Sequence, residues 1–156
     1  MVYIFDTSSF RVLNHYFPQR FPSFWINFDN YVSLGQIISV REVYNELVVQ
    51  GIKPHLISWI NLNKVIFLTP DGNETKFIRQ IFTIPHFRNL VNQKQILQGR
   101  PAADPFVVAA GKVKNACVVT EEKMVKNAAK IPNVCEYFKI DCINMERFME
   151  NEGWEF

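Results

Sequence analysis

The stretch Met1-Val2-Tyr3-Ile4-Phe5-Asp6-Thr7-Ser8-Ser9 decides the fold that the sequence predicts. Residues 2–5 form an uninterrupted apolar run, which is typical of a strand buried on both faces of a parallel sheet. Asp6 then lies at the carboxyl end of that strand, where open α/β sheets bind their ligands. Residues 7–9 can cap the next helix and offer hydroxyls beside the carboxylate. Such residues after a strand are also ordinary turn and cap residues, so both interpretations stay open here.

A second apolar run, Ala116-Cys117-Val118-Val119, predicts another buried strand, and Thr120-Glu121-Glu122 follows it. Two strands that each deliver an acid at the same end are more informative than either alone. The remaining pattern predicts an α/β fold with three layers, in which helices flank a mostly parallel sheet. We expect helices over 10–16, 21–33, 40–50, 53–63, 74–82, 87–97, 105–111, 131–138 and 145–152, and short strands over 36–38 and 140–143. Residues 65–68 form either a short edge strand or an extended link into the turn at 70–72. Residues 52–100 carry no motif, and we expect them to form a helical cap over one edge of the sheet.

Composition indicates a folded, globular chain, which we expect to form a single domain over 1–156. It is 48% hydrophobic and 21% charged, with a net charge of +2, which permits a local basic patch without indicating nucleic-acid binding. Its three cysteines, unevenly spaced and without a CxxC motif, indicate reduced, mostly buried thiols rather than a zinc site or disulfides. No apolar run approaches the roughly 20 residues that span a bilayer, and the start lacks the basic segment of a signal peptide. We therefore expect a cytoplasmic protein without a membrane partner.

Three further acids stand where a helix is expected to begin or continue. Ser39-Val40-Arg41-Glu42 matches a capping box, which gives Glu42 a structural role. Glu46, four residues later, has no such local role and lies beside the apolar stripe, so it is the better candidate for chemistry. Asp104 precedes Pro105 and is expected to be the N-cap of a helix, a role that uses only part of its acceptor capacity.

Four carboxylates gathered at one end of the sheet would repel one another, and some of their pKa values would rise. A divalent cation removes that repulsion, and oxygen ligands suit Mg²⁺ or Mn²⁺ rather than zinc. The reaction implied is hydrolysis of a phosphodiester by a metal-activated water. The predicted catalytic and metal-binding residues are Asp6, Glu46, Asp104 and Glu122. Around them we expect orienting side chains, Thr7, Ser8, Thr120 and Glu42, and two lysines that could attract the substrate backbone, Lys123 and Lys126. A solvated lysine stretch explains those two lysines equally well.

At this point the chain resembles the PIN domain, the fold of VapC-type toxin ribonucleases. Four segments carry the resemblance, in the family's order: Tyr3-Ile4-Phe5-Asp6-Thr7-Ser8, Val43-Tyr44-Asn45-Glu46-Leu47, Ala103-Asp104-Pro105-Phe106-Val107-Val108-Ala109-Ala110 and Val118-Val119-Thr120-Glu121-Glu122. The segments 130–135 and 141–144 look like a less characterised PIN-like branch. The resemblance covers the length of the domain.

The resemblance implies a PIN-like endoribonuclease that depends on Mg²⁺ or Mn²⁺ and acts on RNA. Asp6, Glu46 and Asp104 would be its core acids. The family's fourth acid is usually Asp, two positions after a Thr; that position here is Glu122, one methylene longer, and Glu121 is its nearest rival. A toxin of this kind pairs with an antitoxin protein whose peptide enters the acidic groove, and many members form homodimers.

Other classes fit less well. A haloacid-dehalogenase-type phosphatase needs a second Asp where Ser8 stands, and a response-regulator receiver needs paired acids near its start, which are not evident. The chain has no Gly-rich phosphate loop or dinucleotide fingerprint. The strongest alternative is a PIN-like module with little or no catalysis that binds RNA or a protein partner, because fold alone does not establish activity.

Overall fold

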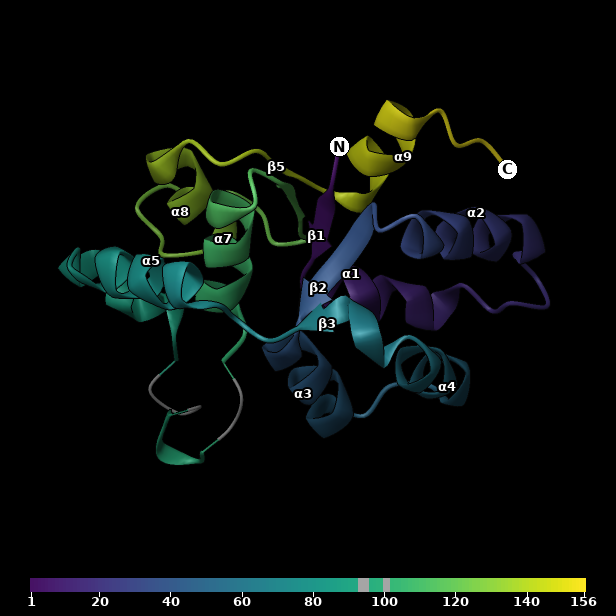
Figure 1. Cartoon of the computed structure of the whole chain (residues 1–156), viewed down its shortest axis with the longest axis horizontal. Coiled ribbons are helices and arrows are strands. Elements are labelled where there is room, and N and C mark those ends of the chain that lie inside the picture. Colours follow the sequence, from purple (N-terminus) through teal and green to yellow (C-terminus); the bar gives the residue numbers. More distant parts are fainter. Residues whose placement is uncertain (93–95, 100–101) are drawn as a thin grey trace.

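A five-stranded sheet runs through the middle of the protein in the computed structural model, which describes residues 1–92, 96–99 and 102–156 (Figure 1). Every strand pairing is parallel, and the strand order is β3-β2-β1-β4-β5. The predicted α/β fold is therefore confirmed, with a sheet that is parallel throughout. Its strands are β1 (Tyr3–Phe5), β2 (Ile37–Val40), β3 (Phe67–Leu68), β4 (Cys117–Val119) and β5 (Cys142–Ile143).

Helices cover both faces of this sheet and complete the three layers (Figure 1). One face carries α1 (Thr7–Val12), α2 (Pro22–Ser33), α4 (Pro54–Leu62) and α9 (Met145–Glu152). The opposite face carries α5 (Gly72–Phe82), α7 (Asp104–Val113) and α8 (Ile131–Phe138). Helix α3 (Arg41–Gln50) follows β2 directly. The described residues also form three short 3-10 helices: η1 (Leu13–His15), η2 (Lys64–Ile66) and η3 (Pro85–Leu90).

The two faces of the sheet are packed by different kinds of side chain. The rings of Tyr3 and Phe5 on β1 both contact Phe148 of α9, at centroid distances of 4.7 and 5.3 Å. Because side chains alternate along a strand, the fully buried Ile4 between them points to the other face. On that face α7 approaches closely: a Cβ added at Gly111 would lie 2.7 Å from Cγ2 of Val118 on β4. Aromatic rings therefore pack against β1 on one face, and α7 lies close against the sheet on the other.

Strand β1 lies at the point where the side on which new strands are added to the sheet reverses. From β1 the chain adds β2 and then β3 on one side, crosses back through α5 and α7, and adds β4 and then β5 on the other side. The segments that leave β1 and β4 therefore diverge at their shared carboxyl edge, which is where ligands bind in open α/β sheets. Asp6 follows β1 at this edge and Thr120 follows β4.

Several local predictions differ from the structure. Strand β2 runs on through Ser39, whose hydroxyl donates to the backbone oxygen of Phe5 at 2.6 Å, so the predicted capping box is wrong. Val40, not Ser39, precedes α3. The helix expected over 87–97 is replaced at its start by η3, because Pro85 begins a tighter turn, and its residues 93–95 lie outside the described residues.

Residues 52–100 do more than cover an edge of the sheet. They supply the edge strand β3, and they place α4 on one face and α5 on the other. Trp59 of α4 contacts Phe28 of α2, whereas α5 packs along α7. Residues 121–130 are irregular, so Lys123, Lys126 and Lys130 do not share a helix face. Within the described ranges, no helix has the length and apolar character needed to cross a membrane.

Candidate functional site

A pocket of about 210 Å³ opens at the carboxyl edge of the sheet, beside the ends of β1 and β4. All four acids that the sequence singled out line it: Asp6, Glu46, Asp104 and Glu122. They come from four separate segments, namely the end of β1, α3, the first turn of α7 and the segment after β4. We call this cavity the acidic pocket. The structure thus brings together the residues that the sequence placed in one site.

Asp6 is held by hydrogen bonds on both carboxylate oxygens. Oδ1 accepts from the backbone N–H of Ser9 and from the hydroxyl of Ser8, each at 2.8 Å, and Oδ2 accepts from Ser8 and from the hydroxyl of Thr120. Asp6 is itself the N-cap of α1, so residues 7–9 do not cap that helix as expected. Burial raises the pKa of Asp6 to about 6, although these hydrogen bonds lower it. Ser8 and Thr120 therefore fix the position of this carboxylate through their hydroxyls.

Glu46 is tied to the segment that carries Asp104. Its Oε2 accepts a hydrogen bond of 2.7 Å from the backbone N–H of Ala103. Burial raises the pKa of Glu46, the Ala103 hydrogen bond lowers it, and the charge of Glu122 raises it further. Thr7, which the sequence placed near these acids, lies beside Glu46, and its hydroxyl lowers the pKa of Glu46. The Thr7 hydroxyl oxygen is buried, and its contacts with the described residues do not meet the geometry of a hydrogen bond.

Asp104 does not cap the helix that it begins. Ala103 is the N-cap of α7, and Asp104 is the first residue inside the helix, so the predicted cap is wrong. Its carboxyl group is partly buried, and its pKa rises to about 8. The largest cause is burial, followed by the charges of Glu122, Glu46 and Asp6, in that order, while Lys130 lowers it. The mutual repulsion expected of these acids is therefore concentrated on Asp104.

Hydrogen bonds direct Glu121 and Glu122, the two candidates for the fourth acid of the site, to different places. Oε1 of Glu121 accepts from the backbone N–H of Met145 at 2.8 Å, which directs this side chain to the start of α9. Oε2 of Glu122 accepts from the N–H of Ile131 at 3.0 Å, at the start of α8, and Glu122 lines the acidic pocket. Glu122 is therefore the acid that joins the other three.

Glu42 lies outside the acidic pocket. Its Oε1 binds the guanidinium of Arg41 at 2.7 Å, and its side chain is not among those that line the acidic pocket. Lys123 and Lys126 are exposed and do not line it either. The lysine that acts on the site is Lys130, because it is the cation that lowers the pKa of Asp104.

Two lining residues were missed by the sequence analysis. Arg11 follows Thr7 by four residues on α1, and Gln50 follows Glu46 by four residues on α3. Residues four apart share a helix face, so this spacing was a readable signal once Thr7 and Glu46 had been chosen. Arg11 brings a guanidinium to a pocket otherwise dominated by carboxylates, and guanidinium groups bind phosphate in a bidentate manner.

Comparison with known families adds one result. A family model described as "Domain of unknown function (DUF4411)" matches residues 3–156. The chain belongs to this family. No curated protein and no solved structure matches the DUF4411 chain.

The donor set of this DUF4411 domain fits a hard divalent cation. Within residues 1–92, 96–99 and 102–156, no three His, Cys, Asp or Glu side chains already form a group that would hold a metal ion. The acidic pocket nevertheless offers only oxygen atoms from carboxylates and hydroxyls, beside Arg11 and Gln50. Burial is the largest cause of the raised pKa values of Asp6, Glu46 and Asp104, and neighbouring carboxylates raise those of Glu46 and Asp104 further, so the ionised forms need compensating positive charge. A cation such as Mg²⁺ or Mn²⁺ would supply it, with small side-chain adjustments.

Proposed function

We propose that this chain is a divalent-metal-dependent endoribonuclease that hydrolyses RNA phosphodiester bonds. One observation carries the proposal: four carboxylates from four separate segments line one pocket of about 210 Å³ at the switch point of a parallel sheet. Such a cluster is costly without a cation, and a cation held by carboxylates alone keeps positions for water and phosphate. Mg²⁺ or Mn²⁺ would be held by Asp6, Glu46, Asp104 and Glu122.

The resemblance to the PIN domain supports the choice of RNA as substrate. The segments that carry it contain these same acids in the family's order. The three-layer parallel α/β fold agrees with that resemblance, although a fold alone does not fix an activity. By the same resemblance, we propose that the protein acts in the cytoplasm as the toxin of a toxin–antitoxin pair, is inhibited by an antitoxin, and forms a homodimer.

Several residues in and beside the acidic pocket have separate tasks in this chemistry. A bound divalent cation lowers the pKa of an attacking water and offsets charge on the phosphoryl oxygens. Ser8, Ser9 and Thr120 fix the orientation of the Asp6 carboxylate. Ala103 fixes Glu46 through its backbone N–H. Arg11 lies where it can bind a substrate phosphate.

Asp104 adds a proton-linked element to this site. Because its pKa lies near 8 in the metal-free protein, its carboxyl group carries a proton at neutral pH. Cation binding must displace that proton, since the metal-bound form of a carboxylate is the ionised one. The proposed activity should therefore rise with pH near neutrality.

The experiment that tests the proposal is cleavage of an end-labelled structured RNA by the purified protein with Mn²⁺ or Mg²⁺. The controls are EDTA, Asp104→Asn, and Glu150→Gln as a matched change of an exposed acid on α9. We expect cleavage that is lost with EDTA and in Asp104→Asn but kept in Glu150→Gln. Cleavage that survives Asp104→Asn would overturn the assignment of the site. Absence of cleavage of several RNAs by folded, antitoxin-free protein would favour the alternative, a PIN-like module that binds RNA or protein without cutting it.

A further inference from the structure

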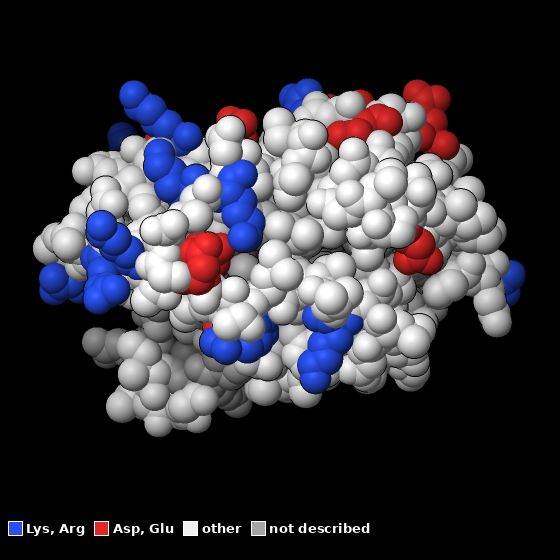
Figure 2. All heavy atoms as spheres, viewed as in Figure 1, with Lys and Arg blue, Asp and Glu red and all other residues white. Residues whose placement is uncertain are grey.

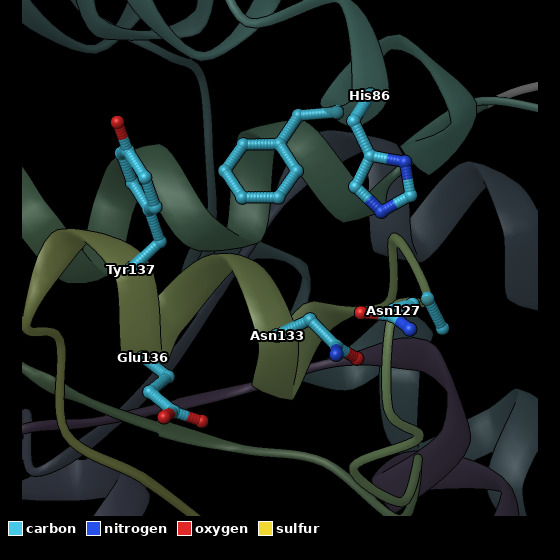
Figure 3. Close-up of a pocket in the computed structure, with 7 residues that line it drawn as sticks. His86, Asn127, Asn133, Glu136 and Tyr137 are labelled. Atoms are coloured by element: carbon cyan, nitrogen blue, oxygen red, sulfur yellow. The ribbon is translucent and has the colours of Figure 1, made fainter.

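A second cavity, of about 520 Å³, lies between η3, the loop that follows β4, and α8 (Figure 3). Its walls combine aromatic rings from His86, Phe87 and Tyr137 with the side-chain amides of Asn127 and Asn133. Figure 3 shows the imidazole of His86 pointing toward the two amides, while Glu136, which also lines the cavity, points away from them. The proposed chemistry of the acidic pocket uses none of these residues.

The aromatic wall of this cavity includes one exposed ring, that of Tyr137. Phe87 is buried, and its ring lies 5.2 Å from that of Tyr137 at an angle of 87°, and 5.8 Å from that of His86. Phe87 therefore braces the two outer rings. Tyr137 is 60% exposed, so much of its flat surface is open to solvent. An exposed aromatic ring beside a cavity suits stacking with a planar group such as a nucleobase.

The polar wall offers a hydrogen-bond acceptor that the protein leaves unused. Nδ2 of Asn133 donates to the backbone oxygen of Val125 at 2.7 Å. Because a carbonyl oxygen only accepts, this bond fixes the orientation of the amide and leaves Oδ1 as an acceptor. Oδ1 is buried and has no hydrogen-bond partner among the residues that the structure describes. A buried acceptor without a partner is costly, and a turn of the Asn133 amide toward the cavity would let Oδ1 accept from an N–H group of a ligand.

This cavity and the acidic pocket share one segment of chain. Glu122 lines the acidic pocket and accepts from the N–H of Ile131, and Asn133 lies only two residues further along α8. Lys130 stands between them as the N-cap of α8, close enough to Asp104 to act on its charge. The start of α8 is therefore common to the surroundings of both cavities.

The charge on this side of the protein also suits a polyanion. Figure 2 shows several Lys and Arg side chains over the α5 and α8 side of the molecule, with one acidic cluster among them, and a larger group of Asp and Glu side chains over α9. The basic residues here include Lys76 and Arg79 on α5 and Lys130 and Lys139 at the two ends of α8. Phosphate groups bound by such residues would hold the strand across both cavities.

We infer that the second cavity is a base-binding subsite, in which an unstacked base of single-stranded RNA stacks on Tyr137 and donates a hydrogen bond to Oδ1 of Asn133. This inference rests on the proposed function for the identity of the ligand, and it names the substrate class as single-stranded. The bases of a duplex are stacked and paired, so they cannot enter such a subsite without unpairing.

The test is binding of a short fluorescein-labelled single-stranded RNA to the full chain, measured by fluorescence anisotropy with EDTA present so that no cleavage occurs. Tyr137→Ala is compared with Tyr137→Phe, which keeps a ring for stacking. Phe156→Ala removes an equally exposed ring, 61% exposed, from the opposite layer of the protein. We expect Tyr137→Ala to weaken single-strand binding about tenfold, the loss typical of one stacked base, while the other two variants bind as the wild type does. Binding of a duplex of the same sequence should be unchanged by all three substitutions.

The outcomes separate this inference from the proposed function. Equal binding by wild type and Tyr137→Ala overturns the subsite, even if metal-dependent cleavage is found. A wild-type protein that does not bind single-stranded RNA overturns it as well. Tyrosine-dependent binding without any cleavage keeps the subsite and overturns the nuclease. Tyr137→Phe that binds as weakly as Tyr137→Ala would show that the hydroxyl, not the ring, makes the contact.

Discussion

The carboxylate of Glu46 accepts a hydrogen bond of 2.7 Å from the backbone N–H of Ala103, a residue 57 positions later in the chain. Ala103 is buried and immediately precedes Asp104. One acid of the acidic pocket therefore fixes the backbone that carries another. Glu46 thus has two roles, as a proposed metal ligand and as the anchor for the start of α7.

Replacing Glu46 separates these two roles. Glu46→Ala leaves the buried N–H of Ala103 without an acceptor, which is expected to lower the free energy of unfolding by about 1–3 kcal/mol. Glu46→Gln keeps an acceptor oxygen and should stay close to wild-type stability. Both changes should abolish metal-dependent cleavage, because neither side chain is a carboxylate. Urea denaturation and the cleavage assay check these outcomes, and equal stability of the two variants would contradict the anchoring role.

The metal-free protein should lose stability as pH rises. The pKa of Asp104 is about 8 in the folded protein against an ordinary value of 3.8, so the folded state binds more protons between about pH 4 and pH 8. Stability therefore falls as pH increases through this window, and Asp6, with a pKa of about 6, adds to the same trend. Asp104→Asn should flatten the slope and be at least as stable as wild type near pH 8. Thermal unfolding in EDTA across this range tests it, and a parallel slope in the variant would count against it.

The hydroxyl of Thr120 should tune metal affinity without being a ligand. It donates to Oδ2 of Asp6 and accepts from the backbone N–H of Glu122 at 3.1 Å. Thr120→Val removes the bond that lowers the pKa of Asp6, so this carboxyl should hold its proton more tightly and bind Mn²⁺ about tenfold more weakly. Thr120→Ser keeps the hydroxyl and should bind as wild type does. Isothermal titration calorimetry measures both, and similar affinities for the Val and Ser variants would refute this role.

Gly111 marks the closest approach of α7 to the sheet. A Cβ here would lie 2.7 Å from Cγ2 of Val118 and 3.1 Å from Cγ2 of Ile140, so Gly111→Ala should cost about 1–3 kcal/mol of unfolding free energy. Gly72→Ala is the matched control, because nothing lies within 4 Å of its added Cβ and its φ is not positive. Urea denaturation compares the two, and a Gly111→Ala protein as stable as the control would show that α7 can shift outward.

The sequence predicted the acidic pocket because the information was local. Asp6 and Glu122 follow apolar runs that are typical of buried strands, and parallel strands bring their carboxyl ends to one edge. Glu46 stood out because it lay beside an apolar stripe without a local partner. Each of these inferences needs only a few neighbouring residues and the geometry of a parallel sheet.

The failures occurred where a tertiary contact decides between two local options. Ser39 matches a helix cap, but the carbonyl of Phe5 takes its hydroxyl and the strand continues. Asp104 matches an N-cap beside Pro105, but α7 begins one residue earlier. The second cavity was missed for the same reason, since its residues 86–87 and 127–137 are brought together only by the packing of η3 against α8.

All three tryptophans lie in the layer formed by α2, α4 and the segment after α9. Trp25 and Trp59 contact each other with ring centroids 5.8 Å apart, and Trp154 contacts Phe24, the residue before Trp25, at the same distance. The layer of α5, α7 and α8 has none. Tryptophan fluorescence of this protein is therefore a probe of one side only. It will report the melting of the aromatic layer, and an extrinsic label on the α8 side will be needed to follow what happens in the two cavities.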